Sequence, residues 1–207
     1  RALTRSRLGI DTLFVIGFTG FVRSWHGLQR IVDLLVEPEF RDSGLLIVGD
    51  GPAIGSIKAR AEELDVSSRV IVTGVVERDT VAEHVASFDV AIQPNVVEYA
   101  SPLKALEYLA MGRAIVAPRS PNICELLDDG ENSLLFELDD QESLRRALLR
   151  LHEDDVMRNA LESCARQTIV DRKLTWRHNA ERVEHMFLEL LDARGGKVGT
   201  RNGRSEH

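Results

Sequence analysis

The chain has few cysteines and no long apolar run. Its 207 residues include two cysteines, Cys124 and Cys164, too few for a disulfide framework. This scarcity favours a reducing compartment, so we expect a cytoplasmic protein in which both cysteines are buried as small apolar residues. No apolar run reaches the length of a membrane span. Residues 1–12 (RALTRSRLGIDT) lack the apolar stretch of a signal peptide.

Several ligand-binding signatures are also missing. No G-x-x-x-x-G-K-[ST] loop is present, which argues against a Walker-type NTPase, and no G-x-G-x-x-G follows the first predicted strand. Neither an Asp-x-Asp near a strand end nor a His/Cys cluster with metal-ligand spacing occurs. We therefore expect no metal site. The net charge of −7 argues against a nucleic-acid partner, although it permits a local cationic pocket for a phosphate.

What the sequence does contain is an alternation of short aliphatic runs and longer helical patterns. The runs are nearly continuous in apolar residues, as in strands buried on both faces. Strands are predicted at 13–19, 45–49, 69–74, 88–93, 113–118 and 133–138. Helices are predicted at 27–39, 53–64, 79–87, 102–111, 121–128, 140–152, 154–168 and 174–193. The alternation predicts an α/β fold with a doubly wound, parallel, six-stranded Rossmann-like sheet and extra C-terminal helices.

Ligands bind such sheets beyond the carboxyl ends of the strands, so the loops there hold the candidate site. The loop at 19–27 has Gly20 near its start, and Arg23 and His26 add positive charge if they face a ligand. In the next loop, Gly49 and Gly51 permit close approach of the backbone. Both loops are equally compatible with ordinary structural turns.

The third loop follows the strand predicted at 69–74. Gly74, Val75 and Val76 would offer backbone N–H and C=O groups and an apolar surface to a flat base. Nothing in these residue types demands that role.

The fourth loop leads into the most informative stretch, YASPLKALEYLAMG at 99–112. A helix beginning near Ser101 or Pro102 turns its N-terminal N–H groups toward the ligand side of the sheet, where anions are stabilised. Lys104 in the first turn is unfavourable for an isolated helix and favourable if an anion binds. Glu107 can accept two hydroxyl hydrogen bonds, as from a ribose. The alternative is a helix with a solvated Lys and Glu.

Seven segments in fixed order resemble one known family. They are VIGFTG with the later WHG, LLIVGDGP, RVIVTGVV, FDVAIQP, SPLKALEYLAMGRAIVA, NICELLDDGENSLLF and TWRHNAERV. From about Leu8 to Leu191 the chain resembles the C-terminal, nucleotide-sugar-binding domain of retaining GT-B glycosyltransferases of glycosyltransferase family 4, also called group 1. The resemblance implies a nucleoside diphosphate sugar as donor substrate, with no metal and no bound cofactor.

The resemblance also implies roles for particular residues. The helix start at Ser101, Pro102 and Leu103, together with Lys104, would lie at the phosphates, and Glu107 matches the glutamate that holds the ribose. A second family glutamate, which contacts the sugar, falls on Tyr99, with Glu98 beside it.

The first loop departs from the family pattern. Family members usually carry an Arg after the first glycine and a Lys before the next. Here Phe21 follows Gly20, His26 precedes Gly27, and Arg23 is the nearest substitute for the missing Arg.

The implied organisation is a linker remnant at 1–12, a donor-binding domain at 13–193 and a disordered tail at 194–207. The family's N-terminal domain is absent from this chain. It would bind the acceptor, a sugar or a lipid, and would carry any peripheral membrane association.

Other classes fit part of the pattern. The altered first loop and Tyr99 favour a non-catalytic nucleotide-sugar-binding or partner subunit. A UDP-sugar epimerase of GT-B architecture and a doubly wound domain without a nucleotide site are further alternatives.

Overall fold

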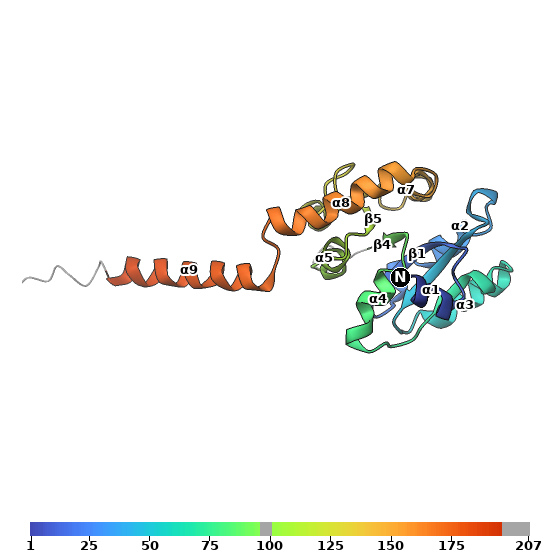
Figure 1. The fold of residues 1–207 in the computed structure, drawn as a ribbon, viewed down its shortest axis with the longest axis horizontal. Helices are drawn as coiled ribbons and strands as arrows, with labels where there is room; N and C mark the ends of the chain where they lie inside the picture. Colours follow the sequence, from blue (N-terminus) through green and yellow to red (C-terminus); the bar gives the residue numbers. More distant parts are fainter. Residues whose placement is uncertain (96–100, 196–207) are drawn as a thin grey trace, which may run out of the picture.

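The fold is a parallel β-sheet covered by helices on both faces (Figure 1). The computed structural model describes residues 1–95 and 101–195. Within these ranges the sheet has six strands in the order β3-β2-β1-β4-β5-β6, and every neighbouring pair is parallel. The strands are β1 (Phe14–Thr19), β2 (Ser43–Val48), β3 (Val70–Val72), β4 (Val90–Ile92), β5 (Ala114–Pro118) and β6 (Leu134–Phe136). The predicted six-stranded Rossmann-like architecture is confirmed.

The helices follow the predicted alternation with shifted ends. They are α1 (Ala2–Leu8), α2 (Gln29–Leu34), α3 (Ile54–Glu63), α4 (Val81–Val85), α5 (Leu103–Ala110), α6 (Pro121–Cys124), α7 (Gln141–Glu153), α8 (Asp155–Asp171) and α9 (Trp176–Gly195). The helix expected at 27–39 stops at Leu34, and a 3-10 turn, η2 (Pro38–Phe40), follows. Glu37 is extended, with φ −72° and ψ 143°, because a residue before proline avoids the helical region.

Two apolar clusters fill the two faces of the sheet. Successive strand residues point to opposite faces, so Ile16 and Phe18 of β1 join one cluster and Val15 joins the other. The first cluster packs under α2, α3 and α7, and the second under α4, α5 and α6. Helix α8 contributes to both, through Leu161 and Ala165 respectively. Because both faces are covered, the strands of the sheet centre are buried, as their continuous apolar sequence predicts.

The strand order reverses beside β1, which pairs with β2 on one side and with β4 on the other. The segments that follow β1 and β4 therefore lead to opposite faces of the sheet, to α2 and α5 respectively, and they diverge at this switch point. Doubly wound sheets bind ligands in the crevice that this divergence creates.

Both cysteines contradict the expectation of burial. Cys124 at the end of α6 and Cys164 in α8 are exposed. In α8 the buried positions are Leu161 and Ala165, so Cys164 falls on the face that turns away from the core. The expectation rested on residue type alone. Whether a side chain in a helix is buried depends on its position around the helix axis, which decides which side chains face the sheet.

The segment predicted as a linker remnant contains α1, which packs on the sheet domain. Arg5 is buried and donates hydrogen bonds to Asp89 Oδ2 at 2.9 Å and to the carbonyl oxygen of Ser87 at 3.1 Å. Asp89 Oδ2 also accepts the N–H of Val15 at 2.7 Å. This network joins α1 to the starts of β1 and β4. The assignment of 1–12 to an interdomain linker stays a prediction.

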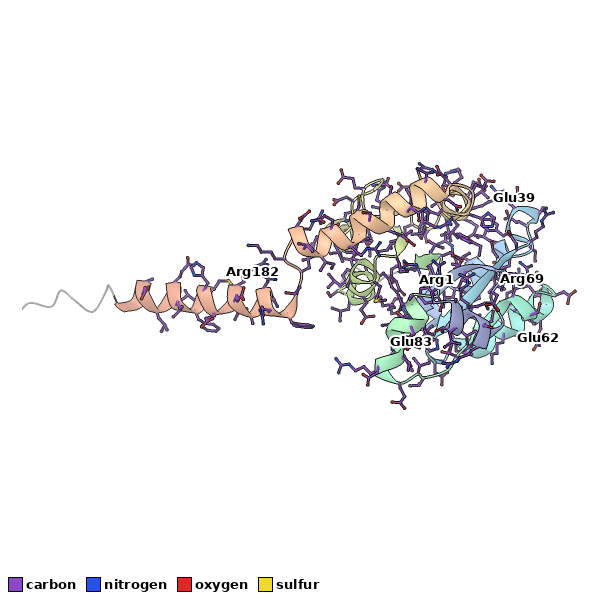
Figure 2. The ribbon with its side chains drawn as sticks, in the orientation of Figure 1. Arg1, Glu39, Glu62, Arg69, Glu83 and Arg182 are labelled. Atoms are coloured by element: carbon purple, nitrogen blue, oxygen red, sulfur yellow. The ribbon has the colours of Figure 1, made fainter. Side chains whose placement is uncertain are left out.

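The last helix, α9, extends away from the sheet (Figure 1). Its side chains, such as that of Arg182, project from it on all sides (Figure 2). Seven of its exposed residues are large and apolar: Trp176, Val183, Met186, Phe187, Leu188, Leu190 and Leu191. Among residues 1–95 and 101–195, no helix combines the length and apolar character that crossing a bilayer requires. Of the tail predicted to be disordered at 194–207, the first two residues belong to α9, contrary to the prediction, and residues 196–207 lie outside the described residues.

Candidate functional site

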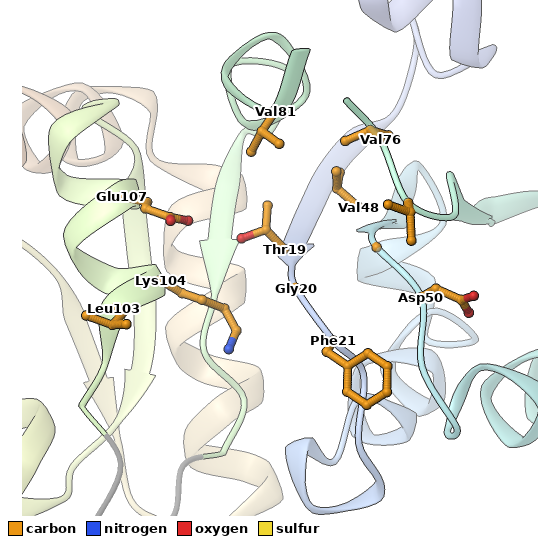
Figure 3. Close-up of a pocket in the computed structure, with 12 residues that line it drawn as sticks. Thr19, Gly20, Phe21, Val48, Asp50, Val76, Val81, Leu103, Lys104 and Glu107 are labelled. Atoms are coloured by element: carbon orange, nitrogen blue, oxygen red, sulfur yellow. The ribbon is translucent and has the colours of Figure 1, made fainter. Parts of the chain in front are cut away.

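A pocket of about 400 Å³ opens at the carboxyl edge of the sheet, between the ends of β1 and β2 and the first half of α5 (Figure 3). It lies beside the switch point where ligands are expected. The predicted site residues that line it are Gly20, Gly49, Val75, Val76, Leu103, Lys104 and Glu107. Residues that sequence reasoning did not assign to the site also line it: Thr19, Phe21, Val48, Asp50 and Val81.

The remaining predicted residues lie outside the pocket lining. They are Arg23, His26, Gly51, Gly74, Ser101 and Pro102. Ser101 and Pro102 immediately precede α5, whereas Tyr99 and Glu98 lie outside the described residues.

The pocket floor is made of two loops in backbone contact. The N–H of Gly20 donates to Val48 O at 2.9 Å, and the N–H of Val22 donates to Asp50 O at 2.8 Å. Gly51 has φ 156°, and a Cβ there would lie 2.2 Å from Val22 O. Only glycine permits this contact. Gly51 therefore helps to hold the two loops together, although it does not line the pocket.

Helix α5 contributes the charged side chains opposite this floor. Lys104 and Glu107 are three residues apart and line one pocket (Figure 3). The Lys104 Nζ lies 5.2 Å from the centre of the Phe18 ring, and its Cε lies 3.4 Å from the position of a Cβ on Gly20. Burial lowers the pKa of Lys104, and the negative charge of Glu107 partly opposes that shift.

The N-terminus of α5 offers fewer open donors than a bare helix end. No side chain caps it, but the N–H of Leu103 donates to Ser101 O and that of Ala105 to Pro102 O, both at 2.9 Å. The Lys104 side chain is therefore the stronger attraction for an anion in this part of the pocket.

Tyr108 fixes α5 to the end of β1. Its ring is fully buried, and its hydroxyl oxygen accepts the backbone N–H of Thr19 at 2.9 Å. Thr19 is the last residue of β1 and lines the pocket. The bond holds the charged turn of α5 in register with the pocket floor.

The positive charge expected from His26 is absent. His26 is 2% exposed, and its Nδ1 accepts the N–H of Arg23 at 3.0 Å. Burial, reinforced by the charges of Lys104 and Arg23, lowers the pKa of His26 to about 4. The imidazole is therefore neutral at pH 7 and packs between the rings of Phe18 and Trp25.

Arg23 lies on the surface at the other side of this turn. Its guanidinium stacks over the ring of Phe21, 5.1 Å from the ring centre, and Phe21 itself lines the pocket. Arg23 thus lies next to the pocket mouth without lining it.

The third loop forms the far wall. Val75 is 86% exposed and Val76 lies beside it in the lining. Gly74 precedes them with φ 70° and bridges to Gly49. This wall is apolar, whereas the α5 wall carries Lys104 and Glu107 and the floor carries Asp50. The two ends of the pocket therefore suit different parts of an amphiphilic ligand.

Strand order, glycine-shaped floor and pocket position together define an α/β domain of the Rossmann type. A sequence model described as "Glycosyl transferases group 1" matches residues 13–154, more than half of the chain. The chain belongs to this family.

Known proteins agree with that assignment. The chain is 28% identical over 144 residues to 2-deoxystreptamine glucosyltransferase of Streptomyces kanamyceticus, covering 68% of this chain and 36% of the relative. The fold matches Anabaena Alr3699/HepE in complex with UDP with a TM-score of 0.78 and 20% identity, over 89% of this chain and 52% of that one. This chain therefore spans about a third to a half of these two proteins.

A third comparison covers a protein of similar length. The C-terminal domain of a group 1 glycosyl transferase, LpcC of Francisella tularensis, matches with a TM-score of 0.69 and 16% identity. The match covers 82% of this chain and 92% of that domain. At this identity the likeness establishes the fold alone.

Proposed function

We propose that this chain is the donor-binding half of a retaining, metal-independent glycosyltransferase. Its pocket would bind a nucleoside diphosphate sugar. The observation that carries the proposal is the convergence of Lys104 and Glu107, from one turn of α5, on a pocket whose opposite wall is apolar. A cation, a hydroxyl acceptor and an apolar surface match the diphosphate, ribose and base of one ligand.

Each part of the donor has a partner in this proposal. Lys104 meets the diphosphate, and Glu107 accepts hydrogen bonds from the ribose hydroxyls. Val75 and Val76 contact the base. Lys104 is partly buried, and a charge acts more strongly on a ligand where water is excluded. Arg23, stacked on Phe21 at the pocket mouth, adds a second positive charge nearby.

These groups also account for the chemistry. In glycosyl transfer the bond between the sugar's anomeric carbon and the diphosphate oxygen breaks, and the bonding electrons stay with the diphosphate. Negative charge therefore grows on the oxygen facing Lys104. Preorganised positive charge at such a position is often the largest contribution to rate. In this proposal no metal ion is required to hold the leaving group.

The acceptor site belongs to a second domain. This proposal rests on the chain spanning 36% of the Streptomyces relative and 52% of HepE, and on its fit to an isolated C-terminal domain. Sugar or lipid acceptors, the remaining catalytic group and any peripheral membrane contact would come with that domain, in the cytoplasm. The present chain alone would bind the donor and turn it over poorly.

One observation favours a non-catalytic binding subunit instead. The resemblance implies two cations in the first loop, whereas Phe21 occupies one of those positions and the neutral His26 the other. Product analysis separates the two functions. The chain, combined with an acceptor domain from a family member, would release nucleoside diphosphate only if it is a catalytic half.

Binding itself is tested by titration calorimetry with UDP and GDP. We expect the chain to bind one of them as tightly in an excess of the chelator EDTA as in the presence of magnesium. Lys58→Ala, at an exposed lysine of α3, is the matched control for Lys104→Ala. Absence of binding by the wild-type chain, or binding only with a divalent cation, would contradict the proposal.

A further inference from the structure

Two hydroxyl groups meet beneath the pocket. Thr19 Oγ1 and Tyr108 Oη lie 3.1 Å apart, and Tyr108 Oη also accepts the backbone N–H of Thr19 at 2.9 Å. Tyr108 is fully buried, while Thr19 is 4% exposed and lines the pocket. Either hydroxyl can donate to the other, so the direction of this bond has to come from the surrounding partners.

The partners of Tyr108 decide that direction. Its hydroxyl has one proton, and burial raises its pKa, so the proton stays in place. Within the described ranges, Thr19 Oγ1 is the one acceptor within hydrogen-bond distance of Oη. If Thr19 donated instead, the Tyr108 proton would be buried without an acceptor, which is costly. Tyr108 therefore donates to Thr19 Oγ1.

That direction leaves the Thr19 proton available. Figure 3 shows the Thr19 hydroxyl on the side of the pocket that faces α5, where the Glu107 carboxylate and the Lys104 side chain converge. With the Tyr108 proton in their shared bond, Thr19 Oγ1 makes no other hydrogen bond to the protein among residues 1–95 and 101–195. A bound ligand's oxygen would supply the acceptor.

We propose that Thr19 is a further ligand-binding residue, whose hydroxyl donates a hydrogen bond to an oxygen of the bound nucleoside diphosphate, and that Tyr108 is the positioning residue that orients it. This inference rests on the proposed donor-binding function. The oxygen belongs either to the phosphates or to the ribose, since both parts of the ligand would pass this point.

The direct test compares Thr19→Val with Thr19→Ser by titration calorimetry, using whichever of UDP and GDP the wild-type chain binds. Valine keeps the shape and removes the hydroxyl, so it should weaken binding about three- to tenfold, the loss of one neutral hydrogen bond. Serine keeps the hydroxyl and should bind within about twofold of wild type by the same reasoning. The free nucleoside is titrated in parallel. A loss shared by nucleoside and nucleotide places the acceptor on the ribose, and a loss confined to the nucleotide places it on the phosphates; both support the inference.

The role of Tyr108 is tested by a double-mutant cycle. Tyr108→Phe should weaken nucleotide binding in the wild-type background and should cost no further affinity in the Thr19→Val background. Melting temperatures of all four proteins are measured alongside, because loss of the bond to the Thr19 N–H destabilises both backgrounds. A tyrosine that acts only through packing would lower affinity by the same factor in both backgrounds, and this result would overturn its positioning role.

Failure of this inference is distinct from failure of the proposed function. If the wild-type chain binds the nucleotide and Thr19→Val binds it equally well, the role of Thr19 is overturned while the donor site stands. If the wild-type chain binds neither UDP nor GDP, both are overturned.

Discussion

A Cβ atom on Gly49 would lie 2.2 Å from the carbonyl oxygen of Gly20. Gly49 and Gly20 immediately follow β2 and β1, and their contact closes the floor of the pocket. Since the obstacle is backbone, it cannot move aside as a flexible side chain could.

Gly49→Ala is therefore expected to destabilise the domain. Gly49 has φ 142°, which an alanine rarely adopts, so strain adds to the collision. We expect a loss of more than about 1 kcal/mol in unfolding free energy, together with weaker nucleotide binding. The measurement is urea unfolding followed by calorimetry.

Gly55→Ala is the matched control. Gly55 lies in α3, and nothing lies within 4 Å of a Cβ there. This variant should gain about 0.5–1 kcal/mol, because glycine loses more conformational freedom than alanine in a helix. Equal stability of the two variants would show that the Gly20–Gly49 contact can relax.

Lys104→Ala and Glu107→Gln should affect different parts of the ligand. Lys104→Ala should weaken UDP roughly ten- to a hundredfold, the loss of a charge-assisted hydrogen bond, and should leave uridine nearly unaffected. Glu107→Gln should weaken UDP and uridine alike, because both contain the ribose. Calorimetry with two ligands and two variants gives the four affinities, with GDP and guanosine used instead if the chain prefers guanine. Unchanged affinities in both variants would leave α5 as an ordinary surface helix.

The burial of His26 predicts an acid-sensitive fold. Its folded pKa of about 4 lies below the ordinary value of 6.5. Between these values the unfolded chain binds more protons than the folded one, so stability falls as pH drops from 6.5 to 4. The full contribution is about 3 kcal/mol, present above pH 6.5.

The measurement is urea unfolding from pH 7.5 to pH 4.5, with wild type and His26→Gln compared at each pH. Other titrating groups cancel in the difference. The wild-type advantage should shrink as the solution becomes more acidic. A difference that stays constant with pH would mean that His26 protonates in the folded domain without penalty.

Arg5 should be far more important for stability than its neighbour Arg7. The Arg5 and Asp89 side chains are each 11% exposed, and removing Arg5 leaves the buried Asp89 carboxylate with the more exposed Arg1 as its remaining ionic partner. Arg5→Ala should cost about 3 kcal/mol of unfolding free energy. Arg7→Ala, on an exposed position of the same helix, should change stability by less than about 0.5 kcal/mol. Similar losses in both variants would indicate that α1 contributes only helix propensity.

The sequence was most informative for elements whose residue pattern alone determines the structure, such as a buried parallel strand or the start of a helix. The run FVIGF at 14–18 is apolar at every position, and both faces of β1 are indeed covered. Turn residues before Lys104 correctly predicted a helix start facing the pocket, because Pro102 cannot continue a preceding element.

The misses depend on contacts between distant segments. Thr19 looked like an ordinary strand end, and its partner Tyr108 is 89 residues away. His26 looked like a surface cation beside Arg23, yet a hydrogen bond from Arg23 and two neighbouring rings bury it as a neutral group. Burial sets protonation, and burial at this turn follows from tertiary packing that no local pattern encodes.

The exposure of Cys124 and Cys164 has a practical consequence for every measurement above. Surface thiols are accessible to oxidants and to maleimide reagents. Concentrated without a reductant, the chain should form covalently linked dimers and larger species, visible as a ladder on a non-reducing gel. The same two thiols, on α6 and α8, give attachment points for a pair of fluorophores without engineering the sequence, so that denaturation can be followed by energy transfer within a single molecule.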